Sequence, residues 1–321
     1  MPRFAELPVR TSAPAGSSWG VFGDEDEIGA FNLLTPERVV AAARLVRTGR
    51  VFPMNWTLLL PSPPLFGRRP LKQGLGAWPD RMVTDDVLHN FYPQVSSQWD
   101  ALRHAGHRQH GFYNGVTIEQ VSERYGGPLA IDKWAERGIA GRGVLLDVAG
   151  HYQRIARPLD GLAQFPITRD VLIETAEAQH VDFQPGDILL VRTGWMASYL
   201  RLTQEERDAL SEASQQGSRS GRFAHPGLAG EELPPFLWDH RVTGVAADNP
   251  AFDMAPPAYE GAISMHGALI GLLGIAIGEM WFLEDLAADC AEDGVYEFFL
   301  TSAPLNMPGG SGSPPNALAI K

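Results

Sequence analysis

Residues 266–279 read His-Gly-Ala-Leu-Ile-Gly-Leu-Leu-Gly-Ile-Ala-Ile-Gly-Glu, so the stretch begins and ends on side chains that can bind a metal ion. A single helix would hold His266 and Glu279 about 20 Å apart, because a helix rises ~1.5 Å per residue. The alternative is a short helix over 268–273, a left-handed Gly274 and a strand that runs back to Glu279. The helix would lead out by about 12 Å and the strand would return by about 16 Å, which brings the imidazole and the carboxylate together. Both interpretations are open on the sequence alone.

A second stretch, residues 94–104, reads Gln-Val-Ser-Ser-Gln-Trp-Asp-Ala-Leu-Arg-His. Asp100 and His104 are four residues apart, and they would share one face if residues 99–105 were helical. A carboxylate beside an imidazole can hold an ion, or it can orient and charge the imidazole for proton transfer. The plainer alternative is an ion pair on the surface of a helix.

The composition is that of a globular protein, since 44% of the 321 residues are apolar and 20% are charged. The formal net charge of −12 argues against nucleic acid and anionic membranes as partners. Cys290 is the single cysteine, which excludes an intrachain disulfide and a zinc site built from several thiolates. The first 20 residues lack the apolar segment of a secretory signal, so we expect a cytoplasmic protein.

The order of the expected elements is mixed α and β. Short apolar runs bounded by turn residues predict buried strands over 143–148, 188–193 and 242–247. Residues 1–20, rich in Ser, Ala, Pro and Gly, are predicted to form an extended arm, and residues 21–321 a single α/β domain. No glycine-rich phosphate loop follows a strand, so no nucleotide cofactor is expected.

Together, residues 94–104 and 266–279 resemble the cyclase family of metal-dependent hydrolases, which includes bacterial kynurenine formamidase and isatin hydrolase. Members of that family carry a His-x-Gly-Thr-His-x-Asp-x-Pro-x-His loop. Its two leading histidines, its aspartate and its last histidine are matched here, in order, by Gln94, Gln98, Asp100 and His104. The later His and Glu of the family match His266 and Glu279. The similarity runs through most of the chain, and the longer subgroup with a Gln-Trp-Asp-Ala-Leu core is nearest.

The resemblance implies a swivelling β/β/α fold on a mixed β-core. It implies homodimers or homotetramers in which subunit contacts help to close the active site. It also implies hydrolysis of an amide, a cyclic amide or an N-formyl group by water that zinc or manganese activates. In that scheme His104 is the proton shuttle.

The chain departs from the family pattern at Gln94 and Gln98, where amides replace imidazoles. An amide oxygen is a weaker ligand for zinc but is acceptable to harder ions, so the preference would shift toward manganese or magnesium. A divalent ion would then be held by Asp100, His266, Glu279 and Gln98. Alternatively the ion is lost, Asp100 orients His104, and Glu279 is free as a second acid or base. The two amides would then donate N–H groups to a substrate oxygen.

Aromatic residues cluster around the loop and could form an apolar pocket, although core packing explains the same pattern. We expect Trp99 and Tyr113 to contact the substrate together with Gln94. His225, in a His-Pro-Gly-Leu stretch after a Ser/Gly-rich loop, is expected to line the pocket as part of a lid, or simply to turn the chain. Residues 248–249, Asp-Asn, end a buried strand, where polar side chains often face a site.

The sequence therefore predicts a hydrolase that acts on an amide, cyclic amide or lactone carbonyl of a small aromatic substrate. The predicted catalytic residues are His104, Asp100 and Glu279. Two alternatives stay open. One is a metal-independent relative that catalyses ring opening, ring closure or dehydration in secondary metabolism. The other is a catalytically inactive protein that binds a small molecule.

Overall fold

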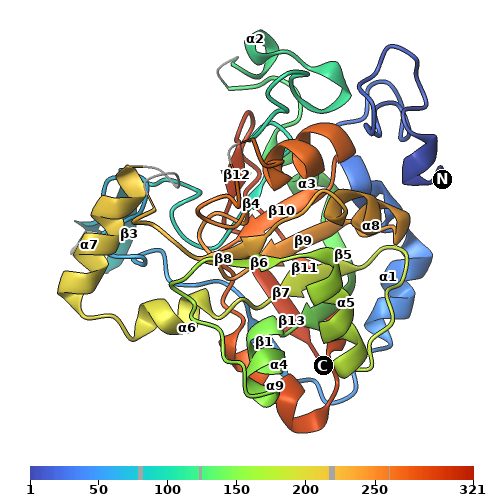
Figure 1. The fold of residues 1–321 in the computed structure, drawn as a ribbon. Coiled ribbons are helices and arrows are strands. Elements are labelled where there is room, and N and C mark those ends of the chain that lie inside the picture. The colour runs from blue at the N-terminus through green and yellow to red at the C-terminus, as the bar shows by residue number, and fades with distance from the viewer. Residues whose placement is uncertain (79–81, 123–124, 217–220, 260) are drawn as a thin grey trace.

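The computed structural model describes residues 1–78, 82–122, 125–216, 221–259 and 261–321, and a large curled sheet forms its centre (Figure 1). The sheet has nine strands among these residues, in the order β1-β13-β11-β5-β7-β9-β10-β4-β12. In chain order they are β1 (Val51–Pro53), β4 (Gln98–Asp100), β5 (Ile139–Leu146), β7 (Ile188–Val191), β9 (Gly244–Ala247), β10 (Ala276–Glu279), β11 (Glu297–Ser302), β12 (Gly312–Ser313) and β13 (Ala317–Ile320). The predicted mixed α/β fold is confirmed.

The middle of the sheet is parallel, and its flanks are antiparallel. Strands β5, β7, β9 and β10 run parallel, whereas β11 pairs antiparallel with β5 and β4 pairs antiparallel with β10. Every residue of β7 and β9 is buried, as expected for parallel strands that are covered on both faces. The buried strands predicted over 143–148, 188–193 and 242–247 correspond to β5, β7 and β9, with boundaries shifted by a few residues.

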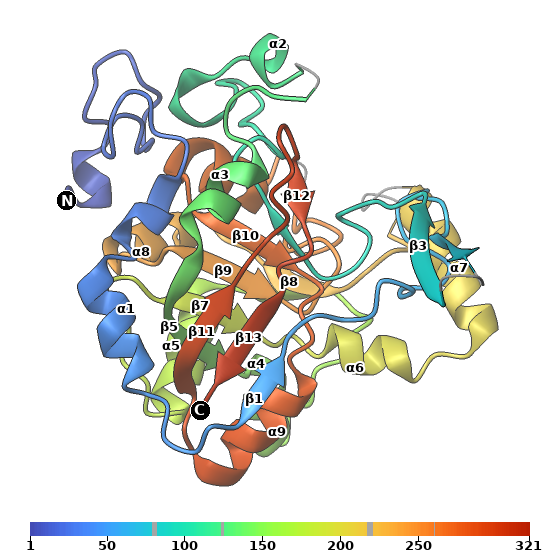
Figure 2. The ribbon, with the colours of Figure 1, turned by 180° about the vertical axis from the view of Figure 1, so that it is seen from behind.

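Helices pack around this sheet. α4 (Val148–Arg154) and α5 (Arg169–Ala178) cover the face turned to the viewer in Figure 1, and they lie behind the sheet in Figure 2. α1 (Pro36–Ala43) contacts β5 and β11. The remaining helices are α2 (Ile118–Val121), α3 (Ile131–Arg137), α6 (Trp195–Leu200), α7 (Gln204–Gln215), α8 (Leu233–Asp239) and α9 (Glu284–Asp293). No helix in the described part of the chain is long and apolar enough to cross a membrane.

Two small sheets lie outside the main one. β6 (Phe165–Ile167) pairs in parallel with β8 (Pro226–Leu228). β2 (Lys72–Trp78) and β3 (Val83–His89) form an antiparallel hairpin, which stands apart from the central sheet on the same side of the molecule as α7 (Figures 1 and 2). All seven residues of β3 are exposed.

The first 20 residues, expected as an extended arm, contain a 3₁₀ turn over Phe4–Glu6 and pack onto the body of the protein at their end. Ser18 and Trp19 are buried. The indole Nε1 of Trp19 donates to the carbonyl of Gly271 at 2.9 Å, and the hydroxyl of Ser18 donates to that of Leu273, also at 2.9 Å. These bonds satisfy carbonyls in the last turn of the helix that precedes Gly274, because a helix end leaves such groups without intrahelical partners.

The stretch 266–279 adopts the helix–glycine–strand arrangement. A π-helix, η6 (His266–Leu273), ends at Gly274, which has φ 64° and ψ 24°, and β10 follows. A Cβ atom at position 274 would lie 2.7 Å from Cε2 of Tyr113, so both the backbone conformation and the available space require glycine here. Of the two interpretations that the sequence left open, the structure adopts the chain reversal at Gly274, although the helix is of the π type and begins two residues earlier than the short helix considered over 268–273.

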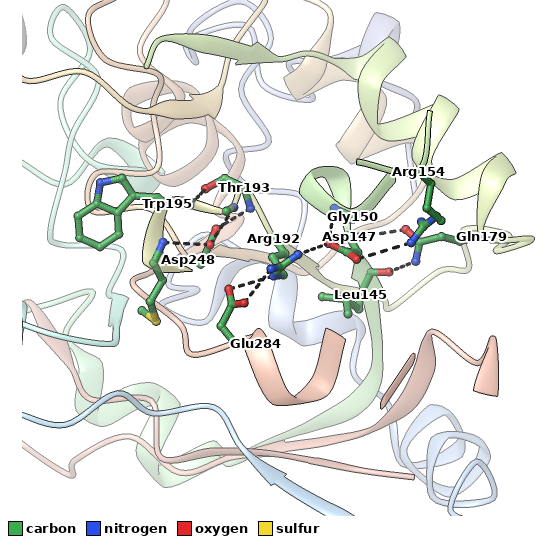
Figure 3. A network of polar contacts seen from close by, with 12 residues as sticks. Leu145, Asp147, Gly150, Arg154, Gln179, Arg192, Thr193, Trp195, Asp248 and Glu284 are labelled. Atoms are coloured by element: carbon green, nitrogen blue, oxygen red, sulfur yellow. Dashed lines mark hydrogen bonds and ion pairs between the residues drawn. The ribbon is translucent and has the colours of Figure 1, made fainter. Parts of the chain in front are cut away.

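A buried polar network ties together the carboxyl ends of the central strands (Figure 3). Arg192, which follows β7, binds Asp147 after β5 at 2.9 Å and Glu284 of α9 at 2.7 Å. Asp248, which follows β9, accepts from the backbone N–H of Thr193 at 2.6 Å and from that of Gly194 at 3.0 Å. All three carboxylates therefore hold the strand ends together, and Asp248 belongs to this network.

We expect Arg192→Leu to destabilise the protein by about 3–5 kcal/mol, since it removes the cation that compensates two carboxylates in a largely buried position. Urea unfolding followed by circular dichroism measures the change. Arg169→Leu is the matched control, because Arg169 also pairs with two carboxylates, Asp170 and Glu232, but both are exposed. The control should lose no more than about 1 kcal/mol. Equal losses in the two variants would contradict the structural role of the network.

Candidate active site and metal-binding cluster

The candidate site begins with the register of β4 against β10. Gln98 lies directly opposite Glu279, and Asp100 opposite Ile277. Because side chains alternate along a strand, Gln98 and Asp100 point to the same face of the sheet and Trp99 points to the other. The amide Nε2 of Gln98 donates to Oε2 of Glu279. The strand pairing thus places the carboxylate from residue 279 beside the loop that carries Asp100.

His104 reaches the site through a turn, and not through the helix considered for residues 99–105. β4 ends at Asp100, and the backbone N–H of His104 donates to the carbonyl of Ala101 at 2.8 Å. Nδ1 of His104 then lies 3.7 Å from Oδ1 of Asp100. The side chain of Asp100 is fully buried, whereas that of His104 is 31% exposed, so the imidazole can exchange protons with solvent.

His266 completes the cluster. Its Nε2 lies 3.1 Å from Oε1 of Glu279 and 3.8 Å from Oδ2 of Asp100. One ligand atom each from Asp100, His104 and His266 lies within 4.8 Å of the others. The chain reversal at Gly274 therefore brings His266 and Glu279 together, although they are 13 residues apart. It also places His266 beside Asp100, which belongs to a distant segment of the sequence.

Buried polar atoms without partners lie at the centre of this cluster. Neither carboxylate oxygen of Asp100 has a hydrogen-bond partner among the described residues, and the same holds for Oε1 of Gln98. Burial raises the pKa of Asp100 to about 6. A buried carboxylate without hydrogen bonds is costly unless a cation pairs with it. The free oxygens of carboxylate and amide, with an imidazole beside them, form a donor set that fits a hard or borderline divalent ion.

Asp253 fixes the orientation of His266. Nδ1 of His266 lies 2.5 Å from Oδ2 of Asp253, whose other oxygen accepts from the backbone N–H of Met265 at 2.6 Å. Burial lowers the pKa of His266, but hydrogen bonds to Asp253 and Glu279 outweigh it and raise the pKa well above its usual value. An ion bound at Nε2 must displace this proton, so its affinity should fall at low pH.

Arg68 is a cation whose charge interacts with the site. Burial is the largest effect on its guanidinium and lowers its pKa, whereas the negative charges of Glu279 and Asp100 act in the opposite direction. The guanidinium also lies over the ring of Phe66, with 5.3 Å between Cζ and the ring centroid. Neither Arg68 nor Asp253 is predicted by the sequence analysis. Arg68 lies in an irregular Pro- and Gly-rich segment with no motif, and Asp253 has only its place shortly after a buried strand as a signal.

A cavity of about 550 Å³ opens beside His266. Three of its polar lining groups belong to His225, Asp253 and His266. Its walls are mostly apolar and include Phe66, Phe223, Leu228, Met254 and Ile263. An apolar cavity with a few convergent polar groups is the usual form of a small-molecule site.

The four residues predicted to contact substrate lie in different places in the structure. His225 lines the cavity. Trp99 is fully buried in the core, where its Nε1 donates to the hydroxyl of Ser302 at 3.0 Å. Tyr113 is also fully buried, and its hydroxyl donates to Asp26 at 3.0 Å. Gln94 lies against Gly312, where an added Cβ would be 2.7 Å from the amide nitrogen.

The profile of the Cyclase family matches residues 57–254, which is more than half of the chain. The chain belongs to the Cyclase family. A solved structure described as a novel cyclase is 35% identical to it, with a TM-score of 0.81, and covers 95% of this chain and 99% of its own. The resemblance predicted from the sequence is therefore confirmed. No curated protein matches the sequence.

Two isatin hydrolases share this Cyclase fold at lower identity. Isatin hydrolase A from Ralstonia solanacearum is 20% identical with a TM-score of 0.59, over 89% of this chain and 97% of its own. Isatin hydrolase A from Labrenzia aggregata, solved with benzyl benzoate, is 19% identical with a TM-score of 0.55, over 84% and 93%. At these identities the likeness shows the fold alone.

The pH dependence of stability tests the environment of Asp100 in chelator-treated protein. Because its pKa is raised to about 6 from the usual 3.8, the folded state binds this proton more tightly than the unfolded chain does. Stability therefore falls as the carboxylate ionises between about pH 4 and pH 6 and then levels off. Relative to Asp100→Asn, the wild type should lose on the order of 3 kcal/mol across this window. Urea unfolding of both proteins at several pH values measures the difference.

The exposed Asp182 supplies the control, since Asp182→Asn should leave the pH profile parallel to that of the wild type. Parallel profiles for the wild type and Asp100→Asn would contradict the account of an uncompensated buried carboxylate.

Metal binding makes a separate prediction at neutral pH. Manganese or zinc added to chelator-treated wild type should raise the unfolding temperature, because a ligand that binds only the folded state stabilises it. At a hundredfold excess over the dissociation constant the gain is about 2.7 kcal/mol. Asp100→Asn should show little of this gain, since the variant lacks the carboxylate that faces the ion. An equal rise in both proteins would place the ion elsewhere.

Proposed function

We propose that this Cyclase-family protein is a hydrolase that opens an amide, cyclic amide or lactone carbonyl of a small aromatic substrate. The observation that carries the proposal is the convergence of Asp100, His104 and His266, of which His266 also lines an apolar cavity. The fold shared with isatin hydrolases supports a carbonyl substrate within a ring. The apolar walls support an aromatic group on the substrate, because binding such a group removes a large apolar area from water.

A divalent ion held by Asp100, His266, Glu279 and the amide oxygen of Gln98 would polarise the substrate carbonyl and lower the pKa of a water molecule. The oxygen-rich donor set favours manganese over zinc. Gln98 has a second role in the proposal, because its N–H bond to Glu279 fixes that carboxylate and leaves its own buried oxygen without a partner among the described residues.

His104 is the proton carrier of the proposal. It takes a proton from the attacking water and returns one to the leaving nitrogen or oxygen, with Asp100 stabilising the charged imidazole. The 3.7 Å separation of the two side chains is long for a hydrogen bond, as is common in sites without substrate. Arg68 supplies a positive charge for the oxygen that becomes negative as water attacks, because it is attracted to the same carboxylates.

A metal-independent reaction is the second candidate, and one observation favours it. His266 already has carboxylate partners on both ring nitrogens, Asp253 and Glu279, so the cluster is partly neutralised without an ion. His104 and Asp100 would then act as the acid–base pair in ring opening, ring closure or dehydration. The outcome that separates the two candidates is activity after chelation: the hydrolase with a bound ion loses it, whereas the metal-independent enzyme keeps it.

We expect His104→Ala to lower kcat by about 10²–10⁴, which is the range for loss of a general acid or base. Formanilide, isatin and dihydrocoumarin present an N-formyl amine, a cyclic amide and an aryl lactone, and their hydrolysis is followed by absorbance. The control is His110→Ala, because His110 is exposed on the same loop and stacks on His107. An unchanged rate in His104→Ala would remove His104 from the mechanism. A wild type that binds but turns over none of these compounds would favour the inactive binding protein.

We also propose that the protein is a homodimer or homotetramer in which a second copy covers the hairpin of β2 and β3. Leu75 and Leu88 share one face of this hairpin and are 70% and 44% exposed. A two-stranded hairpin is at best marginally stable in water without a partner surface.

The mass in solution tests this proposal. The wild type should elute as a dimer or tetramer in light-scattering chromatography, and the double variant Leu75→Glu/Leu88→Glu should shift toward the monomer because it places two charges on the covered face. Val40→Glu is the control, since Val40 is 54% exposed on α1. A monomeric wild type would contradict the proposal.

A further inference from the structure

His225 is held rigidly at the edge of the cavity. It precedes β8, and its backbone N–H donates to the carbonyl of Ala255 at 2.9 Å. Its side chain is fully buried and packs edge-on against the ring of Phe223, with 5.2 Å between centroids and 74° between the ring planes. His225 is nevertheless one of the residues that line the cavity. The position of the ring is therefore fixed before any ligand binds.

The hydrogen bonds around His225 determine which ring nitrogen carries the proton. Nδ1 lies 2.9 Å from the carbonyl oxygen of Pro226, and a carbonyl can only accept, so the proton is on Nδ1. Nδ2 of Asn249 also lies 3.4 Å from Nδ1. Both hydrogens of that amide, however, are donated to the carbonyls of Pro226 at 2.9 Å and Phe252 at 3.0 Å. Asn249 therefore has no hydrogen left for Nδ1 and cannot reverse the assignment.

The other nitrogen, Nε2, is a buried acceptor. It has no hydrogen-bond partner within the described part of the chain. Burial lowers the pKa of His225 to about 4, so the ring is neutral near pH 7 and Nε2 keeps its lone pair. A buried acceptor without a donor is unfavourable, and native proteins keep few of them outside functional sites.

We infer that Nε2 of His225 accepts a hydrogen bond from an N–H or O–H group of the substrate, and so selects aromatic ligands that carry such a donor. The inference rests on the proposed function in one respect, which is that the ligand of the cavity is taken to be the substrate. His225 is a specificity-determining residue in this account, whereas the acid–base chemistry stays with His104. A site built to hydrogen-bond one group discriminates strongly against an analogue that lacks it, because its own polar atom is then left unpaired.

The protonation pattern of His225 can be measured without any substrate. Protein labelled with ¹⁵N-histidine should give one imidazole, absent from His225→Phe, with a protonated Nδ1 and an unprotonated Nε2 in two-bond proton–nitrogen correlation spectra near pH 7. A protonated Nε2 on this residue would overturn the inference. The protonation pattern itself is read from the wild-type spectrum, and the variant serves only to assign the signal to His225.

Phenol and fluorobenzene are the matched probes for selection, since their rings are similar in size and only phenol carries a donor. Phenol should shift the Nε2 signal of His225 and bind about tenfold more tightly than fluorobenzene. The preference should fall to about twofold or less in His225→Phe and stay at about tenfold in His240→Phe. His240 is a suitable control because its Nδ1 also faces a backbone carbonyl, that of Phe236 at 2.9 Å. No preference in the wild type, or no response of Nε2 to phenol, would overturn the inference.

These binding results separate the inference from the proposed function. A protein that shows the phenol preference but hydrolyses none of the carbonyl compounds would refute the hydrolase and leave the role of His225 intact. Hydrolysis of a carbonyl compound without a preference for phenol would refute the role of His225 and leave the proposed hydrolase intact.

Discussion

The reversal of the chain at Gly274 is the constraint on which the site depends. A side chain at this position would need an unfavourable positive φ and would collide with the ring of Tyr113. With glycine there, β10 runs back beside the π-helix and carries Glu279 to within 3.1 Å of His266. The same strand then pairs with β4 and fixes Gln98 and Asp100 against it. One conformational requirement thus positions ligands from two distant segments.

Two of the buried polar clusters in the described part of the chain have opposite character. Around Arg192, carboxylates meet a guanidinium or backbone N–H groups, and the result is a rigid junction of strand ends (Figure 3). Around Asp100 the reverse holds, since two carboxylate oxygens and the Gln98 oxygen lack partners among the residues that the structure describes. A polar network with unpaired members is destabilising by itself. This contrast is the physical reason for assigning structure to the first cluster and function to the second.

Exchange of imidazoles for amides changes what the loop can do. Gln98 uses its N–H to hold Glu279, which an imidazole nitrogen occupied by a metal ion could not do. Gln94 lies against the backbone of Gly312. The ring nitrogens that remain in the cluster belong to His104 and His266, and carboxylates from three segments surround them. The site is therefore richer in oxygen than the family motif, with Arg68 as an added cation.

The sequence by itself determined the features that depend on neighbouring residues: the apolar runs of β5, β7 and β9 and the short separation of Asp100 and His104. It allowed a turn at Gly274 as one of two interpretations, and the structure decided between them. The sequence also indicated the family, because motifs are local. Only the tertiary structure decided that Trp99 and Tyr113 pack in the core, that Asp253 and Arg68 join the site, and that Nε2 of His225 is left without a partner in the described chain. Those facts depend on strand register and on contacts between segments far apart in sequence, and an aromatic or charged residue looks the same in either setting until its neighbours are known.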